Sequence, residues 1–286
     1  MVQPWLGVLH GRVNGSFVAG RDAVAVIDTM HSPADARHIA SWVRQHSAAP
    51  VGMVVNTHHH ADHCFGNQVF GAPVVSSEIC RRIMAGNLDN EWAPDRLAEW
   101  QQAAGGSGLE GLRIKLPTIT FARGCNLFLG PCPGGGSELR LELLHTGGHS
   151  PGHAIVLLPD HGIVFSGDLL FVGRYPFARQ ANPSDWISAL QRIKRMRPEI
   201  VIPGHGPVCD ASRAQEEADR HISYLSETTG LIEERLEKGM EREAILADAA
   251  AFPRFADDGY ERLHVANIAG LLDRILSSRR GDAGAR

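Results

Sequence analysis

The sequence lacks the features of membrane and secreted proteins. None of its apolar stretches approaches the length of about 20 residues that spans a bilayer. The residues after Met1 contain no basic segment leading into an apolar run, so we expect no signal peptide. Both absences favour a cytoplasmic protein that makes no contact with a membrane.

Paired cysteines and an excess of positive charge are missing as well. The five cysteines are an odd number without a Cys-x-x-Cys pair, so we expect reduced thiols and no disulfide framework. The formal net charge is −4, which favours neither a nucleic acid backbone nor an anionic membrane as a partner. We therefore expect a small-molecule partner, and the sequence leaves homo-oligomerisation open.

The composition is otherwise that of a globular protein, apart from its histidines. Hydrophobic residues make up 43% and charged residues 21% of the 286 residues, enough for one large α/β domain with a small appendage. Fifteen histidines are many for this length, and they cluster. Their clustering is therefore the main functional signal.

Short β-branched runs alternate with helical patterns over about the first 210 residues. Ser32 and Pro33 have the residue types of an N-cap and a first helical position, for a helix that ends near His46. Asn182-Pro183 begins a second helix in the same way. We predict strands at residues 23–28, 51–56, 72–76, 112–116, 139–145, 154–158, 162–166 and 199–202.

Two regions depart from this alternation. Residues 77–111 have a helical pattern and carry Trp92 and Trp100, which suit either a lid or ordinary core. After residue 210 the strand signals vanish, and about three helices follow. This change of pattern predicts a boundary at residue 210, with residues 211–286 as a helical extension packed on the first part.

A metal-binding pattern follows the strand predicted at 51–56. In extended chain, side chains two apart share a face, so His58 and His60 can converge on one ion. A turn into helix near Ala61 would redirect Asp62 and His63 toward a second point. Imidazole and carboxylate suit Zn²⁺, at ligand distances of about 2.0–2.2 Å.

Three later residues argue against a chance cluster of surface histidines. His149, Asp168 and His205 are all ligand-type residues beside glycines, in turns that end predicted strands. Glycine lets the backbone come close to a metal. Together with the first cluster they predict one composite site.

The order His-x-His-x-Asp-His, then His, then Gly-Asp, then Gly-His is similar to the metallo-β-lactamase superfamily, most of all to its glyoxalase II branch. The resemblance covers about residues 8–210. It implies an α/β fold, an αβ/βα sandwich with the site at one edge. Residues 1–210 would then be the catalytic domain.

The resemblance also implies a role for each matching residue. His58, His60 and His149 would bind the first zinc, and Asp62, His63 and His205 the second. Asp168 would bridge the two ions. Asp28 would support the ligands, although Met30 replaces the glycine of the family's Asp-Thr-Gly stretch.

The implied chemistry is hydrolysis. Two zinc ions about 3.5–4 Å apart would share a hydroxide that attacks a carbonyl, with Asp62 and Asp168 as the catalytic carboxylates. The expected substrate is a thioester, an ester or a lactone. The residue types do not choose zinc over iron or manganese.

Other residues are assigned from their position near the ligands. Arg174, Tyr175, Phe177 and Arg179 follow Asp168 closely and are our candidates for substrate binding. We expect His59 to point outward, His153 to have a supporting role and Cys64 to be a small buried thiol.

Two alternatives stay open at this point. Persulfide dioxygenases of the same fold use a single iron, but they and glyoxalase II tend to have Cys-Gly-Arg where residues 171–175 here are Phe-Val-Gly-Arg-Tyr. A non-catalytic metal-binding protein is the second alternative, although all seven ligand positions are filled. Lactonases of the superfamily also resemble the chain, in the turn at 146–153.

Overall fold

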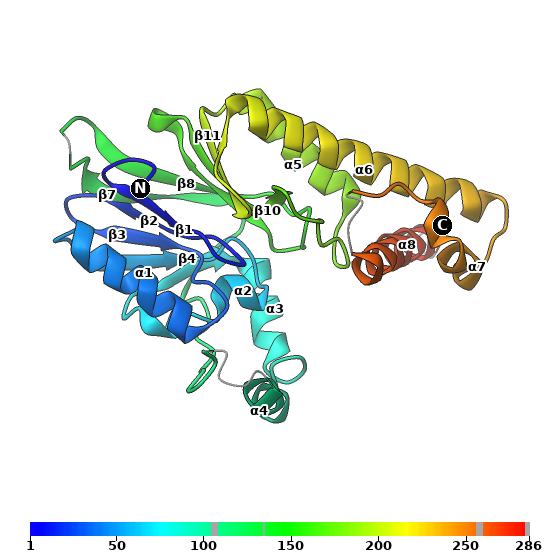
Figure 1. Cartoon of the computed structure of the whole chain (residues 1–286), viewed down its shortest axis with the longest axis horizontal. Coiled ribbons are helices and arrows are strands. Elements are labelled where there is room, and N and C mark those ends of the chain that lie inside the picture. The colour runs from blue at the N-terminus through cyan, green and yellow to red at the C-terminus, as the bar shows by residue number, and fades with distance from the viewer. Residues whose placement is uncertain (104–107, 134, 256–259, 284–286) are drawn as a thin grey trace.

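The computed structural model describes residues 1–103, 108–133, 135–255 and 260–283 (Figure 1). Two six-stranded mixed sheets form the body of the molecule. The first sheet runs in chain order through β1 (Leu6–Leu9), β2 (Gly15–Ala19), β3 (Val24–Ile27), β4 (Val51–Val55), β5 (Val74–Ser77) and β6 (Ile119–Phe121). The second has the order β12-β11-β10-β9-β8-β7, from β7 (Gly124–Pro131), β8 (Glu138–His145), β9 (Ala154–Leu158), β10 (Ile163–Phe171), β11 (Ile200–His205) and β12 (Cys209–Asp210).

The two sheets pack face to face over a shared apolar core. Val18 and Ile27 of the first sheet belong to the same buried cluster as Leu141, Val156 and Phe165 of the second. Burial of this kind stabilises a fold by about 25 cal/mol per Å² of apolar surface. The inner layer of the molecule is therefore a sandwich of two sheets.

Helices cover the outer faces of both sheets. Helix α1 (Pro33–His46) packs Ile39 and Val43 on the first sheet, while α5 (Pro183–Met196) packs Trp186 and Leu190 on the second (Figure 1). The remaining helices are α2 (Ala61–Cys64), α3 (Glu78–Asn87), α4 (Pro94–Ala103), α6 (Ala211–Glu237), α7 (Arg242–Ala247) and α8 (Glu261–Ala283). The predicted αβ/βα sandwich with C-terminal helices is confirmed.

Local signals fix the ends of the two covering helices. The Ser32 hydroxyl accepts a hydrogen bond from the Asp35 backbone N–H across 3.0 Å, and Pro33 follows as the first helical residue. The Asn182 side chain caps α5 in the same way. Both predicted helices are therefore confirmed.

One predicted strand is wrong, and of the two alternatives for Trp92, lid or core, the structure supports core. Residues 112–116 form no strand; Leu112 instead packs in a cluster with Trp92 and Phe65. Trp92 is buried and its ring meets that of Phe65 at a centroid distance of 5.3 Å. Trp92 is thus a core residue beneath α2.

The C-terminal helices pack on the second sheet. Helix α6 runs alongside α5 (Figure 1), and buried residues of α6 and α8 join the cluster around Trp186. Whether residues 1–210 and 211–286 are separate units stays a prediction. In the described part of the chain, no helix combines the length and the apolar character that crossing a membrane requires.

Candidate metal centre

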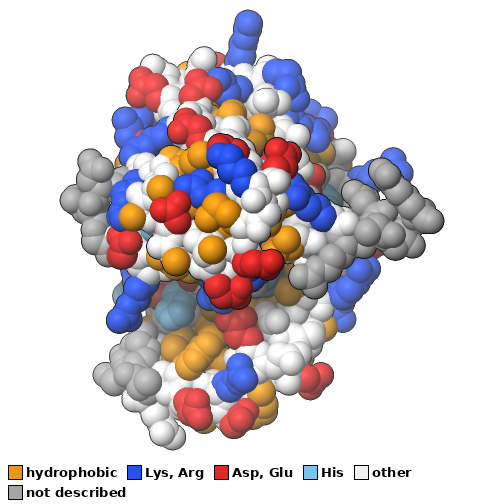
Figure 2. Space-filling view, turned by 90° about the vertical axis from the view of Figure 1, so that its right-hand side faces the viewer, with side chains coloured by type: hydrophobic (Ala, Val, Ile, Leu, Met, Phe, Trp, Pro, Cys, Tyr) orange, Lys and Arg blue, Asp and Glu red, His pale blue; other side chains and the backbone are white. Residues whose placement is uncertain are grey.

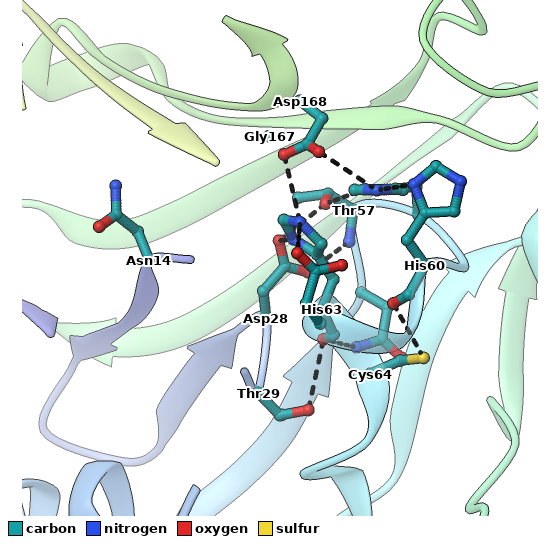
Figure 3. A network of polar contacts seen from close by, with 12 residues as sticks. Asn14, Asp28, Thr29, Thr57, His60, His63, Cys64, Gly167 and Asp168 are labelled. Atoms are coloured by element: carbon teal, nitrogen blue, oxygen red, sulfur yellow. Dashed lines mark hydrogen bonds and ion pairs between the residues drawn. The ribbon is translucent and has the colours of Figure 1, made fainter. Parts of the chain in front are cut away.

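The seven predicted ligands come together at one edge of the sandwich. Four of them follow β4 and lead into α2, and the others come from the turn between β8 and β9, from β10 and from the end of β11. They are His58, His60, Asp62, His63, His149, Asp168 and His205. Figure 3 shows His60 and His63 on one side of the site and Asp168 on the other.

Four of these residues form a first group. Nδ1 of His60 lies 3.0 Å from Nε2 of both His58 and His149, and Oδ2 of Asp168 lies 3.8 Å and 3.5 Å from the same two nitrogens. Ligand atoms about 2.1 Å from a tetrahedral ion are separated by roughly 3.4 Å. The four atoms therefore have the spacing of one tetrahedral site.

The other three residues form a second group beside it. Oδ2 of Asp62 lies 3.4 Å from Nε2 of His205 and 3.9 Å from Nε2 of His63. Asp168 reaches this group too, with its two oxygens 3.2 Å from His63 and 3.3 Å from His205. Asp168 thus lies between both groups, as a bridging ligand must.

Glycines allow Asp168 to reach this position. A Cβ on Gly204 would lie 1.9 Å from Oδ1 of Asp168, and Gly167 has φ +50°, in the region that favours glycine. The pairing of β10 with β11 also shifts register around Gly167. Such a bulge re-aims the next side chain, here Asp168, toward the site.

Hydrogen bonds decide which ring nitrogen of His63, and which ring nitrogen of His58, faces Asp168. Nδ1 of His63 donates to Oδ2 of Asp28 across 2.7 Å, which leaves Nε2 as the free ligand atom. The Thr57 hydroxyl donates to the same Asp28 oxygen and accepts from Nδ1 of His58 across 3.0 Å. Asp28 therefore supports two ligands, as the sequence suggested, even though Met30 has φ +64° where the family has glycine.

The second nitrogen of two further ligands is also held. Nε2 of His60 donates to Oε1 of Gln180 across 3.0 Å, so that Nδ1 faces the site. Nδ1 of His205 donates to the backbone carbonyl of Arg12, so that Nε2 faces the site. Such outer contacts orient metal-binding histidines.

The donor atoms of the site suit a cation. Nε2 of His63 and Oδ1 of Asp168 are buried without a hydrogen bond in the described part of the structure. Burial lowers the pKa of His63, but Asp168, Asp28 and Asp62 together raise it well above its usual value. Burial lowers the pKa of His58 and His149, so these two are neutral, as metal ligands must be. The residues present therefore fit divalent cations.

A cavity of about 430 Å³ opens beside these ligands. Figure 2 shows a hollow between the C-terminal helices and the lower part of the molecule, with histidine visible inside it. Arg174, Tyr175 and Phe177 line the cavity, as predicted residues of a substrate pocket should. Its lining is completed by Arg12, His60, Ala61, Asp62, Glu91, Asp168, Phe171, His205, Tyr260 and Leu263.

Arg179 does not join the described lining of this cavity. Its guanidinium carbon lies 6.0 Å from the centroid of the Phe177 ring, and its backbone packs against Gly270 of α8. The structure therefore gives the prediction for Arg179 no support.

Tyr175 is buried, and its hydroxyl lies 2.7 Å from Nδ1 of His264.

Helix α8 braces the segment that carries Phe177. The buried Asn267 side chain accepts from the Ala178 backbone N–H across 2.8 Å and donates to the Pro176 carbonyl across 2.7 Å. It also donates to the Tyr224 hydroxyl at 3.4 Å. The sequence offered no sign of this brace, because Ala178 and Pro176 lie 89 and 91 positions away from Asn267.

The expectation for His59 is wrong in one respect. Its ring lies outside both ligand groups, but it is only 2% exposed, and the side chain of Gln180, from the segment after β10, interacts with it. His153 stacks on His58 at a centroid distance of 5.2 Å, which fits a supporting role. Cys64 is a buried thiol that donates to the His60 carbonyl, as expected.

The family follows from comparison with known proteins. A sequence model of the Metallo-beta-lactamase superfamily matches residues 9–205. The chain belongs to the metallo-β-lactamase superfamily. Among its relatives, a hydroxyacylglutathione hydrolase of Synechococcus sp. (strain CC9902) is 28% identical over 69% of this chain and 66% of its own length. An acyl-coenzyme A thioesterase of Gallus gallus is 28% identical over 60% of this chain and 62% of its own length.

Solved structures extend the likeness to almost the whole chain. The sec-alkylsulfatase Pisa1 from Pseudomonas sp. has a TM-score of 0.75 and 14% identity, over 96% of this chain and 49% of its own. A metallo-beta-lactamase family protein of Thermus thermophilus has a TM-score of 0.66 and 19% identity, over 97% of this chain and 95% of its own. These likenesses concern the fold. The chain spans about two thirds, or less, of the length of the two relatives named above.

Proposed function

We propose that this chain is a dinuclear zinc hydrolase acting on a carbonyl substrate, a thioester, an ester or a lactone. His58, His60 and His149 would hold one ion, Asp62, His63 and His205 the other, and Asp168 would bridge them. Iron or manganese would suit the same ligands. The observation that carries the proposal is the convergence of the ligand atoms of seven residues, with the tautomers of His58, His60, His63 and His205 set by neighbouring groups.

The side chains divide the work of hydrolysis. Two bound divalent cations polarise a carbonyl and lower the pKa of water to about 7. Burial raises the pKa of Asp62, but His63 and His205 hold it well below the usual range. Asp62 is therefore ionised at neutral pH, and it lines the cavity, where it can accept a hydrogen bond from the attacking water and orient it.

The pocket favours substrates with good leaving groups. Tyr175 carries the buried hydroxyl of the lining. This hydroxyl is hydrogen-bonded to His264, so we do not assign it the role of protonating a leaving group. Thioesters, activated esters and lactones need less protonation than amides. The names of the relatives point the same way, because a hydroxyacylglutathione and an acyl-coenzyme A are both thioesters.

A panel of substrates tests this proposal. Zinc-loaded protein is offered an octanoyl thioester, a lactone, a β-lactam and a phosphodiester, and the Asp168→Ala variant is the control for contaminating activity. We expect turnover of the thioester or lactone that the variant loses. Turnover of the phosphodiester alone would contradict the substrate class, and one bound iron with oxygen uptake on a persulfide would support the dioxygenase alternative.

A further inference from the structure

The loop between β1 and β2 is fixed onto the loop that carries His205. The Asn14 side chain, only 4% exposed, donates to the carbonyls of Pro203 and Gly206 across 2.9 Å and 2.8 Å. Its backbone N–H donates to Gly204, and the Arg12 carbonyl accepts from His205. Arg12 is therefore presented to the cavity from a rigid loop, beside a candidate metal ligand (Figure 3 shows Asn14 at this loop).

Two arginines line this side of the cavity. Arg12 and Arg174 both line it, and Nη2 of Arg174 donates to the Gly11 carbonyl at 3.5 Å, which places Arg174 against the loop of Arg12. Within the described residues neither guanidinium forms an ion pair. Their charge is thus available to a ligand.

The carboxylates of the cavity do not cancel this charge. Asp62 and Asp168 face the histidines of the metal centre, at 3.2–3.9 Å from their nitrogens. Glu91 is the remaining carboxylate of the lining. With two divalent cations bound, the cavity carries a net positive charge, which favours an anionic ligand.

We propose that Arg12 and Arg174 bind an anionic group of the substrate, a carboxylate, sulfonate or phosphate, while Phe177 and Leu263 contact its apolar part. Guanidinium groups bind such anions by charge-assisted hydrogen bonds, often through two parallel contacts. The inference rests on the proposed hydrolase function, since it names the class of ester or thioester that the site accepts: one with an anionic group and an apolar chain.

Binding of a pair of unreactive thioethers tests the subsite. One is the S-octyl thioether of 3-mercaptopropionate, and the other is its neutral carboxamide. Isothermal titration calorimetry on zinc-loaded protein should show the carboxylate binding about tenfold or more tightly than the amide, the size expected for hydrogen bonds to a charged group. Arg12→Ala and Arg174→Ala should each weaken this preference, and the double variant should abolish it.

A control and a second readout separate the possible failures. Arg37→Ala, an exposed arginine on α1, should keep the full preference. Equal binding of both thioethers by the unmodified protein, or a preference that survives in the double variant because the carboxylate binds the metals, would overturn the subsite. If the preference follows the arginines but the octanoyl thioester of the same thiol is not hydrolysed, the subsite stands and the proposed function fails.

Discussion

Asp28 accepts a hydrogen bond from Nδ1 of His63 across 2.7 Å, and this contact decides which nitrogen of His63 faces Asp168. The same carboxylate also accepts from the Thr57 backbone N–H and hydroxyl, at 2.8 Å and 2.7 Å. All three groups are donors, so the side chain at position 28 must accept hydrogen bonds through both of its oxygens. Asp28 therefore shapes the candidate metal centre, although it belongs to neither of the two ligand groups.

Asp28→Asn should weaken the second metal site. An amide offers one acceptor oxygen and one NH₂ group, so one of the three donors would face another donor. Loss of such a supporting contact lowers metal affinity by about 10–100-fold. Competition with a chromophoric chelator measures the two affinities separately. Asp160→Asn, at an exposed residue that belongs to neither ligand group and pairs with Arg140, is the matched control, and equal affinities in Asp28→Asn and the control would contradict the role of Asp28.

Asn267→Leu should raise KM more than it lowers kcat. The variant frees the Pro176 carbonyl and the Ala178 N–H on either side of Phe177, so the apolar wall loses its fixed position. Such contacts act in the ground state and the transition state alike. Each buried group left unpaired also costs about 1–3 kcal/mol of stability, which thermal unfolding measures.

Thr228→Val is the control for this brace. The Thr228 hydroxyl is buried in α6 with no hydrogen-bond partner among the described residues, so its removal should leave KM unchanged. Metal content should be equal in both variants. A fall in kcat at constant KM for Asn267→Leu would show that the brace acts on the chemistry and not on the pocket wall.

The free energy of unfolding should fall as the pH is lowered from about 6.5 to 4, in part because of His221. Burial lowers the pKa of His221 to about 4, and its Nε2 accepts from the Phe171 backbone N–H. The unfolded chain therefore binds this proton first. The group contributes stability that is fully present above pH 6.5 and is lost as the pH falls through 4, about 3 kcal/mol in all.

The variant His221→Gln tests this contribution. Glutamine can still accept from Phe171 but does not titrate, so the variant should lose stability less steeply over the same pH range. Urea unfolding of both metal-free proteins at several pH values gives the two slopes, and the protonation of the metal ligands cancels in the comparison. Parallel slopes would show that His221 does not titrate as described.

The five cysteines should be dispensable for activity. None lies in the two ligand groups, and burial raises the pKa of the Cys80 thiol to about 12 and of the Cys209 thiol to about 11. Thiols react as thiolates, so the native protein should resist iodoacetamide at pH 7.5 while the denatured chain is labelled fully. Loss of activity on modification of Cys64 alone, with metal retained, would contradict this prediction.

The sequence predicted the ligand-bearing parts of the fold best. Strand β4 and the turn at His58–His63 have strong local signals, a β-branched run and a cluster of one residue type. Asn14, by contrast, acts through the carbonyls of Pro203 and Gly206, about 190 positions away. No local pattern reveals such a contact, so the position of the loop of Arg12 was not predicted. Strands β1 and β2 on either side of this loop were not predicted either.

The wrong strand at 112–116 has a different cause. Alternating apolar residues satisfied the strand pattern, but these residues pack on Trp92 instead of pairing in a sheet. The Lys115 ammonium donates to the carbonyls of Phe70 and Ala72, which fixes the segment beside the residues that precede β5. Tertiary contacts thus took the place of the strand partners that the pattern implied.

Metal content tests the central claim most directly. The chain is reconstituted with excess zinc, passed through a desalting column and measured by elemental analysis against its protein concentration. Seven ligand atoms arranged as two groups around Asp168 predict about two zinc ions per chain, falling to about one or fewer in Asp168→Ala with the fold retained. A firm value of one ion per chain in the unmodified protein, unchanged in Asp168→Ala, would contradict the dinuclear centre.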